Sequence, residues 1–376
     1  LMRKYRPDFT AVHFLETDQV QHRYWQFLPG EPRHEIGGAH TDAILRLYRE
    51  VEEALALILA EVGNDVTLCL MSDHGFGPTR QQVWLNNWLI KNGYLVLRST
   101  ASVKMKQTIY RLGLSPAAIR ERAPERLKLA ILQFFERQKG RAIATEMENQ
   151  SEPLVKKSLA DRLTERLALD FYDVNWSESR AFSTGTTAVG YVYLNVAGRD
   201  PQGIVQPGAA YEQLRDEIIA ALRTWSPVGE VMRRENEWHG PQTHNAPDIV
   251  VRWASPETDA RYFQTRISSH HLQKMVPNDY ASHRREGLFL FRGQHVSSGN
   301  RVDADILDLT PTFLWLLDQP VPTYMDGQVL DKVIQLDRPV IRQEMPITQT
   351  SQPEDTLTAD EEAAIEESLR SLGYLE

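Results

Sequence analysis

The stretch "FLETDQVQHRYW" (14–25) carries one pair of residues that could hold a metal ion. His22 follows Asp18 by four positions, so a helix that begins near Thr17 would present both side chains on one face. A carboxylate oxygen and an imidazole nitrogen together suit Zn²⁺, and also Mn²⁺ or Fe. The same spacing also fits a carboxylate at a helix N-terminus with an unrelated surface histidine, so both interpretations stay open.

A second pair follows the apolar run in "TLCLMSDHGF" (67–76), where Asp73 and His74 stand side by side. Charge at the end of a buried strand needs a partner, which favours a ligand pair here. The alternative is a capping aspartate that bonds its neighbour. Gly75 and Gly77 would let this loop turn tightly beside a metal ion.

The remaining histidines give weaker signals. His239 and His244, in "EWHGPQTHNAPD", form a rival ligand pair that we place outside the site. His283, in "YASHRREGLFLF", precedes a predicted strand rather than following one, so its position alone says little. Five others are interpreted as core or surface residues: His13, His34, His40, His270 and His271.

Three elements would position the two pairs. We predict a strand over 8–15, a helix over 41–63 and a second strand over 65–73, which together form a βαβ unit. The helix has one apolar stripe, and Gly63 ends it. Sites in open α/β sheets gather at the carboxyl ends of the strands, where Asp18 and Asp73 both stand.

The rest of the chain changes character twice. From Arg98 to Arg166 it is basic and helical, with 15 Lys or Arg against 8 Asp or Glu, and we expect an inserted helical cap over the site. Strand-like runs return at 190–196, 248–253 and 287–293. Helices are predicted over 209–225, 306–318 and 359–375.

These patterns predict an α/β fold with a mostly parallel sheet, helices on both faces and an inserted helical cap. The predicted domain divisions are 1–98 (first part of a metal-binding α/β core), 99–176 (cap), 177–335 (second part of the core) and 336–376 (linker and C-terminal helix).

Composition excludes several classes of protein. The 376 residues are 41% hydrophobic, and no apolar run is long enough to span a membrane. The net charge of −9 argues against a specific nucleic-acid-binding surface over the whole molecule. Cys69 is the single cysteine, so an intramolecular disulfide and a thiolate metal cluster are excluded. With no signal-peptide pattern at the start, we expect a cytoplasmic protein.

Several stretches, in order, resemble the alkaline phosphatase superfamily. They are "ETDQVQH", "SDHGF", "SHRREGLFLFRG" and "DLTPTFLWLLDQPVPTYMDGQVL". The nearest resemblance is to its type I phosphodiesterase/nucleotide pyrophosphatase branch, supported by "YVYLNVAGRDPQGIV", "APDIVV" and "LRSLGYL". The cap is the part that matches least.

The resemblance implies a site with two divalent metal ions, usually zinc. Asp18, His22 and His283 would hold one ion, and Asp73 and His74 would belong to the other. A further aspartate and a Thr or Ser nucleophile would precede the strand predicted over 8–15, where this chain offers no suitable residue. We therefore expect the N-terminal part of the fold, including the nucleophile, to lie upstream of Leu1, and the chain as it stands to be inactive.

The resemblance implies a metal-dependent hydrolase of phosphodiester or pyrophosphate bonds that acts on a small phosphoester or nucleotide. A metal-dependent phosphomutase of the same superfamily is an alternative, although the helical rather than α/β character of the insert disfavours it. A sulfatase needs an N-terminal Cys or Ser motif that cannot be inspected in this chain. A non-catalytic metal-binding relic is the remaining alternative. The sequence leaves the oligomeric state and the physiological substrate open.

Overall fold

A computed structural model describes residues 2–31, 33–63, 65–111, 169–184, 188–261, 272–274 and 281–346. The chain divides into two compact units. Unit 1 combines Leu1–Gly77 with His283–Glu376, and unit 2 is Pro78–Ser282. The five residues that the family resemblance assigns to the metal site all belong to unit 1. They are Asp18, His22, Asp73, His74 and His283.

Unit 1 contains both ends of the chain. Its described elements are α1 (Met2–Tyr5), α2 (Glu16–Tyr24), the 3₁₀ helix η1 (Trp25–Phe27), α3 (Ala43–Val62), β1 (Leu68–Met71), β2 (Gly75–Pro78), β11 (Phe289–Arg292), the 3₁₀ helix η4 (Ile306–Asp308), α11 (Leu309–Leu316), β12 (Val321–Pro322) and β13 (Arg342–Gln343). Strand β10 (Ala281–Arg284) leads into it from unit 2.

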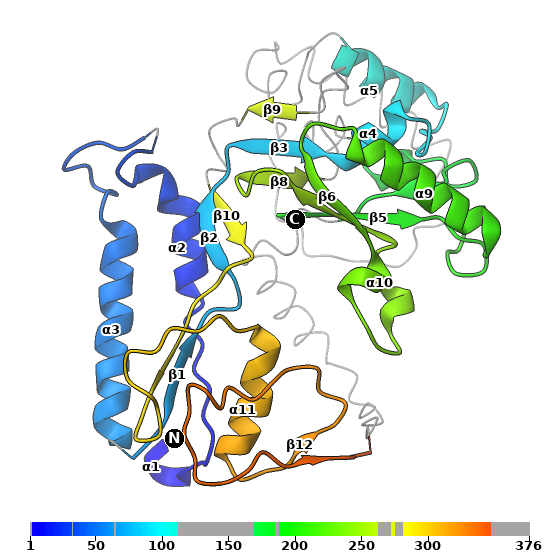
Figure 1. Ribbon diagram of the computed structural model, residues 1–376. Coiled ribbons are helices and arrows are strands. Elements are labelled where there is room, and N and C mark those ends of the chain that lie inside the picture. The colour runs from blue at the N-terminus through cyan, green and yellow to red at the C-terminus, as the bar shows by residue number, and fades with distance from the viewer. Residues whose placement is uncertain are drawn as a thin grey trace. The chain divides into compact units, whose positions relative to one another are not determined.

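Two predicted helices of unit 1 are confirmed. The helix predicted over 41–63 is α3, and it ends at Gly63, whose φ of 80° lies in the region that glycine adopts without strain. The helix expected near Thr17 is α2, which begins at Glu16. Figure 1 shows α2 beside α3.

The strand that leads to Asp73 and His74 belongs to a two-stranded antiparallel ribbon. In it β1 pairs with β11, with Cys69 opposite Phe291. Phe291 reaches α11, where its ring lies 6.3 Å from that of Phe313. The apolar run before Asp73 is therefore a strand, as predicted, but its partner comes from the far end of the sequence.

Unit 2 is built on a four-stranded antiparallel sheet in the order β4-β5-β7-β6. Its described elements are β3 (Gln81–Trp84), α4 (Leu85–Lys91), α5 (Ala101–Arg111), the 3₁₀ helix η2 (Phe171–Asp173), β4 (Ala181–Phe182), β5 (Val189–Leu194), α9 (Ala209–Arg223), β6 (Val228–Arg233), α10 (Arg234–Glu237), the 3₁₀ helix η3 (Thr243–Asn245), β7 (Ile249–Trp253), β8 (Thr258–Arg261) and β9 (Leu272–Lys274).

The core of unit 2 lies between this sheet and its helices. Gly190, Val192 and Leu194 of β5 are buried, and the residues between them are half-buried. This alternation is typical of an antiparallel strand with one well-covered face. Helix α9 packs beside β6, as Figure 1 shows, and buries Ile218 and Leu222. The strands predicted at 190–196 and 248–253 are confirmed as β5 and β7.

Two expectations need correction. Residues 8–15 are not a strand, and the ring of Phe9 packs against Phe313 of α11 instead, 5.5 Å between centroids. The predicted parallel βαβ unit is therefore not found in the described residues. Among described strands with known register, β3–β8 and β12–β13 are parallel and the other pairs are antiparallel.

Most of the predicted cap and the predicted C-terminal helix lie outside the described residues. At the edges of the cap, α5 and η2 are joined by a buried ion pair of 2.6 Å between Lys106 Nζ and Asp173 Oδ2. The domain divisions predicted from the sequence stay a prediction. Within the described part of the chain, no helix is both long and apolar enough to cross a membrane.

Candidate metal centre

Helix α2 supplies Asp18 and His22. Their spacing of four residues places both on one face of the helix, as predicted. Asp18 is mostly buried, with 18% of its side chain exposed, and His22 keeps 35%. Gln21, on another face of α2, donates to Tyr48 of α3 and so helps to fix the helix that carries the pair.

Two loops that are far apart in sequence are locked together beside α2. The backbone N–H of Ser72 donates to the Leu288 carbonyl, and the Leu288 N–H donates back to the Ser72 hydroxyl, each at 2.9 Å. A Cβ on Gly75 would lie 2.0 Å from the carbonyl oxygen of Glu286. This approach brings the segment after β1 directly against the segment after β10.

Gly75 and Gly77 were expected to allow a tight turn in this loop. The structure gives a different reason for glycine here. Neither Gly75 nor Gly77 has a positive φ. Gly75 is needed for the close approach to the Glu286 backbone, whereas a Cβ on Gly77 would meet the Arg284 side chain, with Nε at 2.8 Å. Strand β2 pairs with β10 here, which places His74 beside His283. Their rings stack with centroids 3.8 Å apart.

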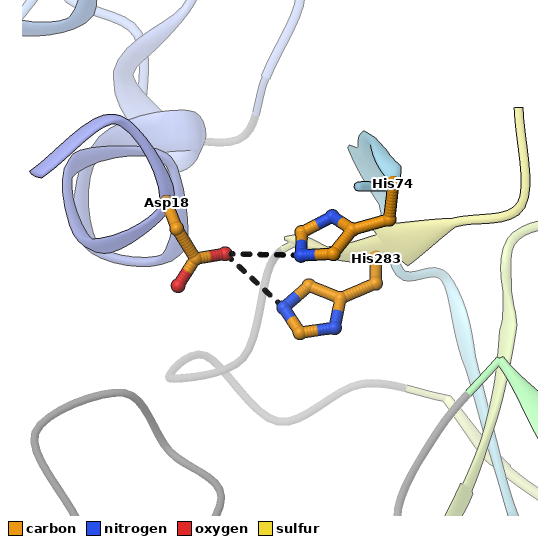
Figure 2. A group of neighbouring side chains, drawn as sticks. All are labelled: Asp18, His74 and His283. Atoms are coloured by element: carbon orange, nitrogen blue, oxygen red, sulfur yellow. Dashed lines mark hydrogen bonds and ion pairs between the residues drawn. The ribbon is translucent and has the colours of Figure 1, made fainter. Parts of the chain in front are cut away.

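Three imidazole nitrogens converge on one oxygen of Asp18. The distances to Asp18 Oδ1 are 3.1 Å from His283 Nε2, 3.5 Å from His22 Nε2 and 3.9 Å from His74 Nε2. Figure 2 shows His74 and His283 side by side, both pointing at the carboxylate. His22 Nε2 also lies 3.0 Å from His283 Nε2. The structure thus brings together Asp18, His22 and His283, and adds His74 to them.

Hydrogen bonding fixes which nitrogen of His74 is free to bind a ligand. His74 Nδ1 lies 3.0 Å from the Gly75 carbonyl oxygen, which can only accept. Nδ1 therefore carries a proton, so in the neutral imidazole Nε2 turns its lone pair toward the carboxylate of Asp18. Two facing acceptors repel each other unless a cation or a proton lies between them. A backbone carbonyl that fixes the tautomer in this way is the usual support of a metal-binding histidine.

The spacing of these atoms fits a metal ion. Bonds of roughly 2.0–2.2 Å in a tetrahedral zinc site place neighbouring ligand atoms about 3.4 Å apart. The three distances to Asp18 Oδ1 and the distance between His22 Nε2 and His283 Nε2 range from 3.0 to 3.9 Å. Of the described residues, Asp18, His74 and His283 form a group whose ligand atoms all lie within 4.8 Å of one another. The donor set therefore fits a divalent ion that accepts nitrogen and oxygen.

The electrostatics of Asp18 also favour an ionised ligand. Burial alone would raise the pKa of its carboxyl. The hydrogen bond with His283 and the positive charge that His22, His283 and His74 can carry outweigh burial, so the pKa falls below its ordinary value. Asp18 is thus a carboxylate at neutral pH, which is the form that binds metal ions.

Asp73 is placed differently from the other four candidates. Its side chain is 70% exposed, and its Oδ1 accepts from the backbone N–H of His74 at 3.1 Å. That bond is the capping arrangement considered as an alternative from the sequence. The same Oδ1 lies 3.7 Å from His74 Nε2, so it is near the cluster without entering it. The assignment of Asp73 and His74 to a second metal ion stays a prediction.

Other candidates lie elsewhere. His244 is exposed, and its Nδ1 lies 2.9 Å from the Pro241 carbonyl oxygen. Ser183 is buried in unit 2, where its backbone bonds the Asn86 side chain. The local sequence gave little weight to His283, because the pairing of β10 with β2 brings it to the site. No local pattern reveals that pairing.

Comparison with known families agrees with the resemblance. Residues 1–171 match the family model of the type I phosphodiesterases / nucleotide pyrophosphatases. The match includes Asp18, His22, Asp73 and His74, and it ends before His283. No curated protein and no solved structure matches the chain. The type I phosphodiesterase resemblance predicted from the motifs is therefore confirmed over residues 1–171, and it implies an α/β fold of the alkaline phosphatase type.

Proposed function

We propose that this protein is a metal-dependent hydrolase of phosphodiester or pyrophosphate bonds in small phosphoesters or nucleotides. The convergence of three imidazole Nε2 atoms on Asp18 Oδ1 carries the proposal. The type I phosphodiesterase match over residues 1–171 supplies the reaction class. Zinc is the proposed metal, because imidazole nitrogen and a single carboxylate suit it best, with Mn²⁺ or Fe as alternatives.

Some residues of the site would bind the metal ions, and others would shape their surroundings. Asp18, His22 and His283 would hold one ion, and His74, with Asp73, would contribute to a second. Bound ions of this kind neutralise charge on phosphoryl oxygens and lower the pKa of an attacking hydroxyl. Asp18 supplies the negative charge that retains a cation, and the Gly75 carbonyl keeps His74 in the tautomer that exposes Nε2.

The proposal is tested by hydrolysis of a chromogenic phosphodiester with added Zn²⁺ or Mn²⁺. We expect metal-dependent turnover from a longer chain that includes the Thr or Ser nucleophile implied by the resemblance. His74→Ala should abolish the activity, and His244→Ala should leave it unchanged, because His244 lies in the other unit.

Two results would separate the parts of the proposal. Turnover by the 376 residues alone would place the nucleophile within them and keep the reaction class. Metal binding without hydrolysis of any diester or pyrophosphate by the longer chain would contradict the reaction class itself.

A further inference from the structure

An aromatic ring lies among the histidines of the candidate metal centre. The ring of Phe76 meets that of His22 edge to face, with centroids 4.7 Å apart and planes at 80°. It meets His283 in the same manner at 5.7 Å, and it lies 6.5 Å from His74. These separations fall in or near the range of about 4.5–7 Å in which aromatic pairs attract. A single side chain thus contacts histidines from two separate segments, α2 and β10, and lies near His74 of its own segment.

The sequence explains why Phe76 reaches this position. Residues 74 and 76 are two apart along an extended segment, so their side chains point to the same face. Asp18 and His22 of α2 and Trp25 at the start of η1 follow one another at intervals of four and three, which places them on one stripe. The Trp25 ring lies 5.7 Å from Phe76 and backs it from that side. Phe76 therefore projects from β2 against the ligand face of α2, with the ring of His283 also beside it.

We propose that Phe76 is a positioning residue that fixes the orientation of the His22 and His283 imidazoles at the metal centre. This inference rests on the proposed function. His22 is the most exposed of the four converging side chains, with 35% of it accessible, and it stands on a short helix. Contact with the ring of Phe76 restricts its rotation, so that Nε2 keeps facing Asp18.

The ring also gives the centre an apolar wall. A half-buried Phe76 backed by Trp25 excludes water from one side of the imidazoles, which strengthens their interaction with charge nearby. An aliphatic side chain of similar size would fill the space but would lack the flat ring, with its partially positive edge and partially negative face. The geometry of the ligands should then loosen even where the fold is kept.

The test is a titration with Co²⁺, whose visible absorption reports the geometry of its ligands, on four versions of the full chain. They are wild type, Phe76→Leu, Phe76→Tyr and the control Phe27→Leu. Phe27 lies on η1 and packs against Tyr24 and His40. Its loss should disturb local packing without touching the centre.

We expect Phe76→Leu to weaken Co²⁺ binding by about 10–100-fold, the usual effect of losing a residue that orients metal ligands. Its absorption spectrum should change, and Phe76→Tyr, which keeps the ring, should restore both. A purely structural role would instead lower the melting temperature of Phe76→Leu and Phe27→Leu alike and leave both spectra as in wild type. Should Phe76→Leu not fold, Phe76→Met is judged by the same criteria.

The outcomes separate the two claims. Equal Co²⁺ affinity and an equal spectrum in wild type and Phe76→Leu would overturn the role of Phe76 alone. A wild-type chain that binds no Co²⁺ would overturn both this role and the metal centre. Metal binding without hydrolysis of any phosphoester by the longer chain would contradict the proposed function, while the affinity comparison still decides the role of Phe76.

Discussion

His22 Nε2 and His283 Nε2 lie 3.0 Å apart, although 261 residues separate them in the sequence. Such a contact between two nitrogens is stable only when a proton or a cation lies between them. Asp18 lies within 3.5 Å of both and supplies a negative charge. The contacts of Ser72 and Gly75 hold the N-terminal and C-terminal segments of unit 1 together beside these three side chains. The fold and the metal binding of the centre therefore depend on the same contacts.

Gly75→Ala tests these contacts. The new methyl group would meet the Glu286 carbonyl oxygen at 2.0 Å, and backbone cannot yield as a flexible side chain can. We expect the variant to lose about 1–3 kcal/mol of stability, as for other overpacked sites, and to bind metal more weakly, because His74 and His283 are pushed apart. Thermal unfolding and Co²⁺ titration measure the two effects. Wild-type values for both would show that the loops are not held as described.

A buried carboxylate in unit 2 should dominate its stability. Asp248 is fully buried and accepts five hydrogen bonds, two from Arg199 and one each from Arg234, Tyr211 and the Leu194 backbone. Asp248→Ala would leave two guanidinium groups without their shared partner, so we expect a loss of about 3–5 kcal/mol in urea unfolding.

The matched control for Asp248 is Glu230→Ala, which removes an ion pair with Arg252 at the surface. Glu230 is 56% exposed, so its loss should cost only about 0–1 kcal/mol. Similar losses for both variants would show that burial does not set the strength of these pairs.

Cys69 offers a reporter for the ribbon of β1 and β11. Burial raises the pKa of its thiol to about 11. A raised pKa means that the protonated thiol is favoured in the folded state, so this stabilisation is present below the ordinary pKa of about 8.5 and is lost as pH rises through about 11. At pH 8 the native protein should therefore react slowly with iodoacetamide, and denaturant should speed the reaction.

Because Cys69 is the single cysteine, Cys69→Ser provides a complete blank for this measurement. Labelling of the native protein at the rate of an unfolded control would contradict the burial of β1 against β11.

The sequence predicted the local part of this site well and the long-range part poorly. The apolar stripe of α3 and the four-residue spacing of Asp18 and His22 are local patterns, and both gave the correct helix. Strand pairing is not local. Residues 8–15 have a β-like composition, yet a strand needs a partner, and Phe9 packs on α11 instead.

The same limit explains His283 and Phe76. Nothing near His283 marks it as a ligand, since its importance comes from the pairing of β10 with β2. Phe76 reads as an ordinary apolar residue after "SDHG", and its position beside three histidines appears only when α2, β2 and β10 are assembled. The family resemblance grouped His283 with Asp18 and His22, and the structure brings these three side chains together. Its role as a metal ligand stays a prediction.

The most direct test of the metal centre is calorimetric titration of the apo-protein with Zn²⁺. Asp18, His22, His74 and His283 are predicted to bind at least one ion per chain. His283→Ala should weaken the binding by more than about 100-fold, since losing a ligand exceeds the effect of losing a supporting residue. His244→Ala, far from these ligands in the sequence and in the other unit, should bind as wild type does. Failure of the wild-type chain to bind Zn²⁺, or equal binding by His283→Ala, would contradict the assignment of this cluster as a metal centre.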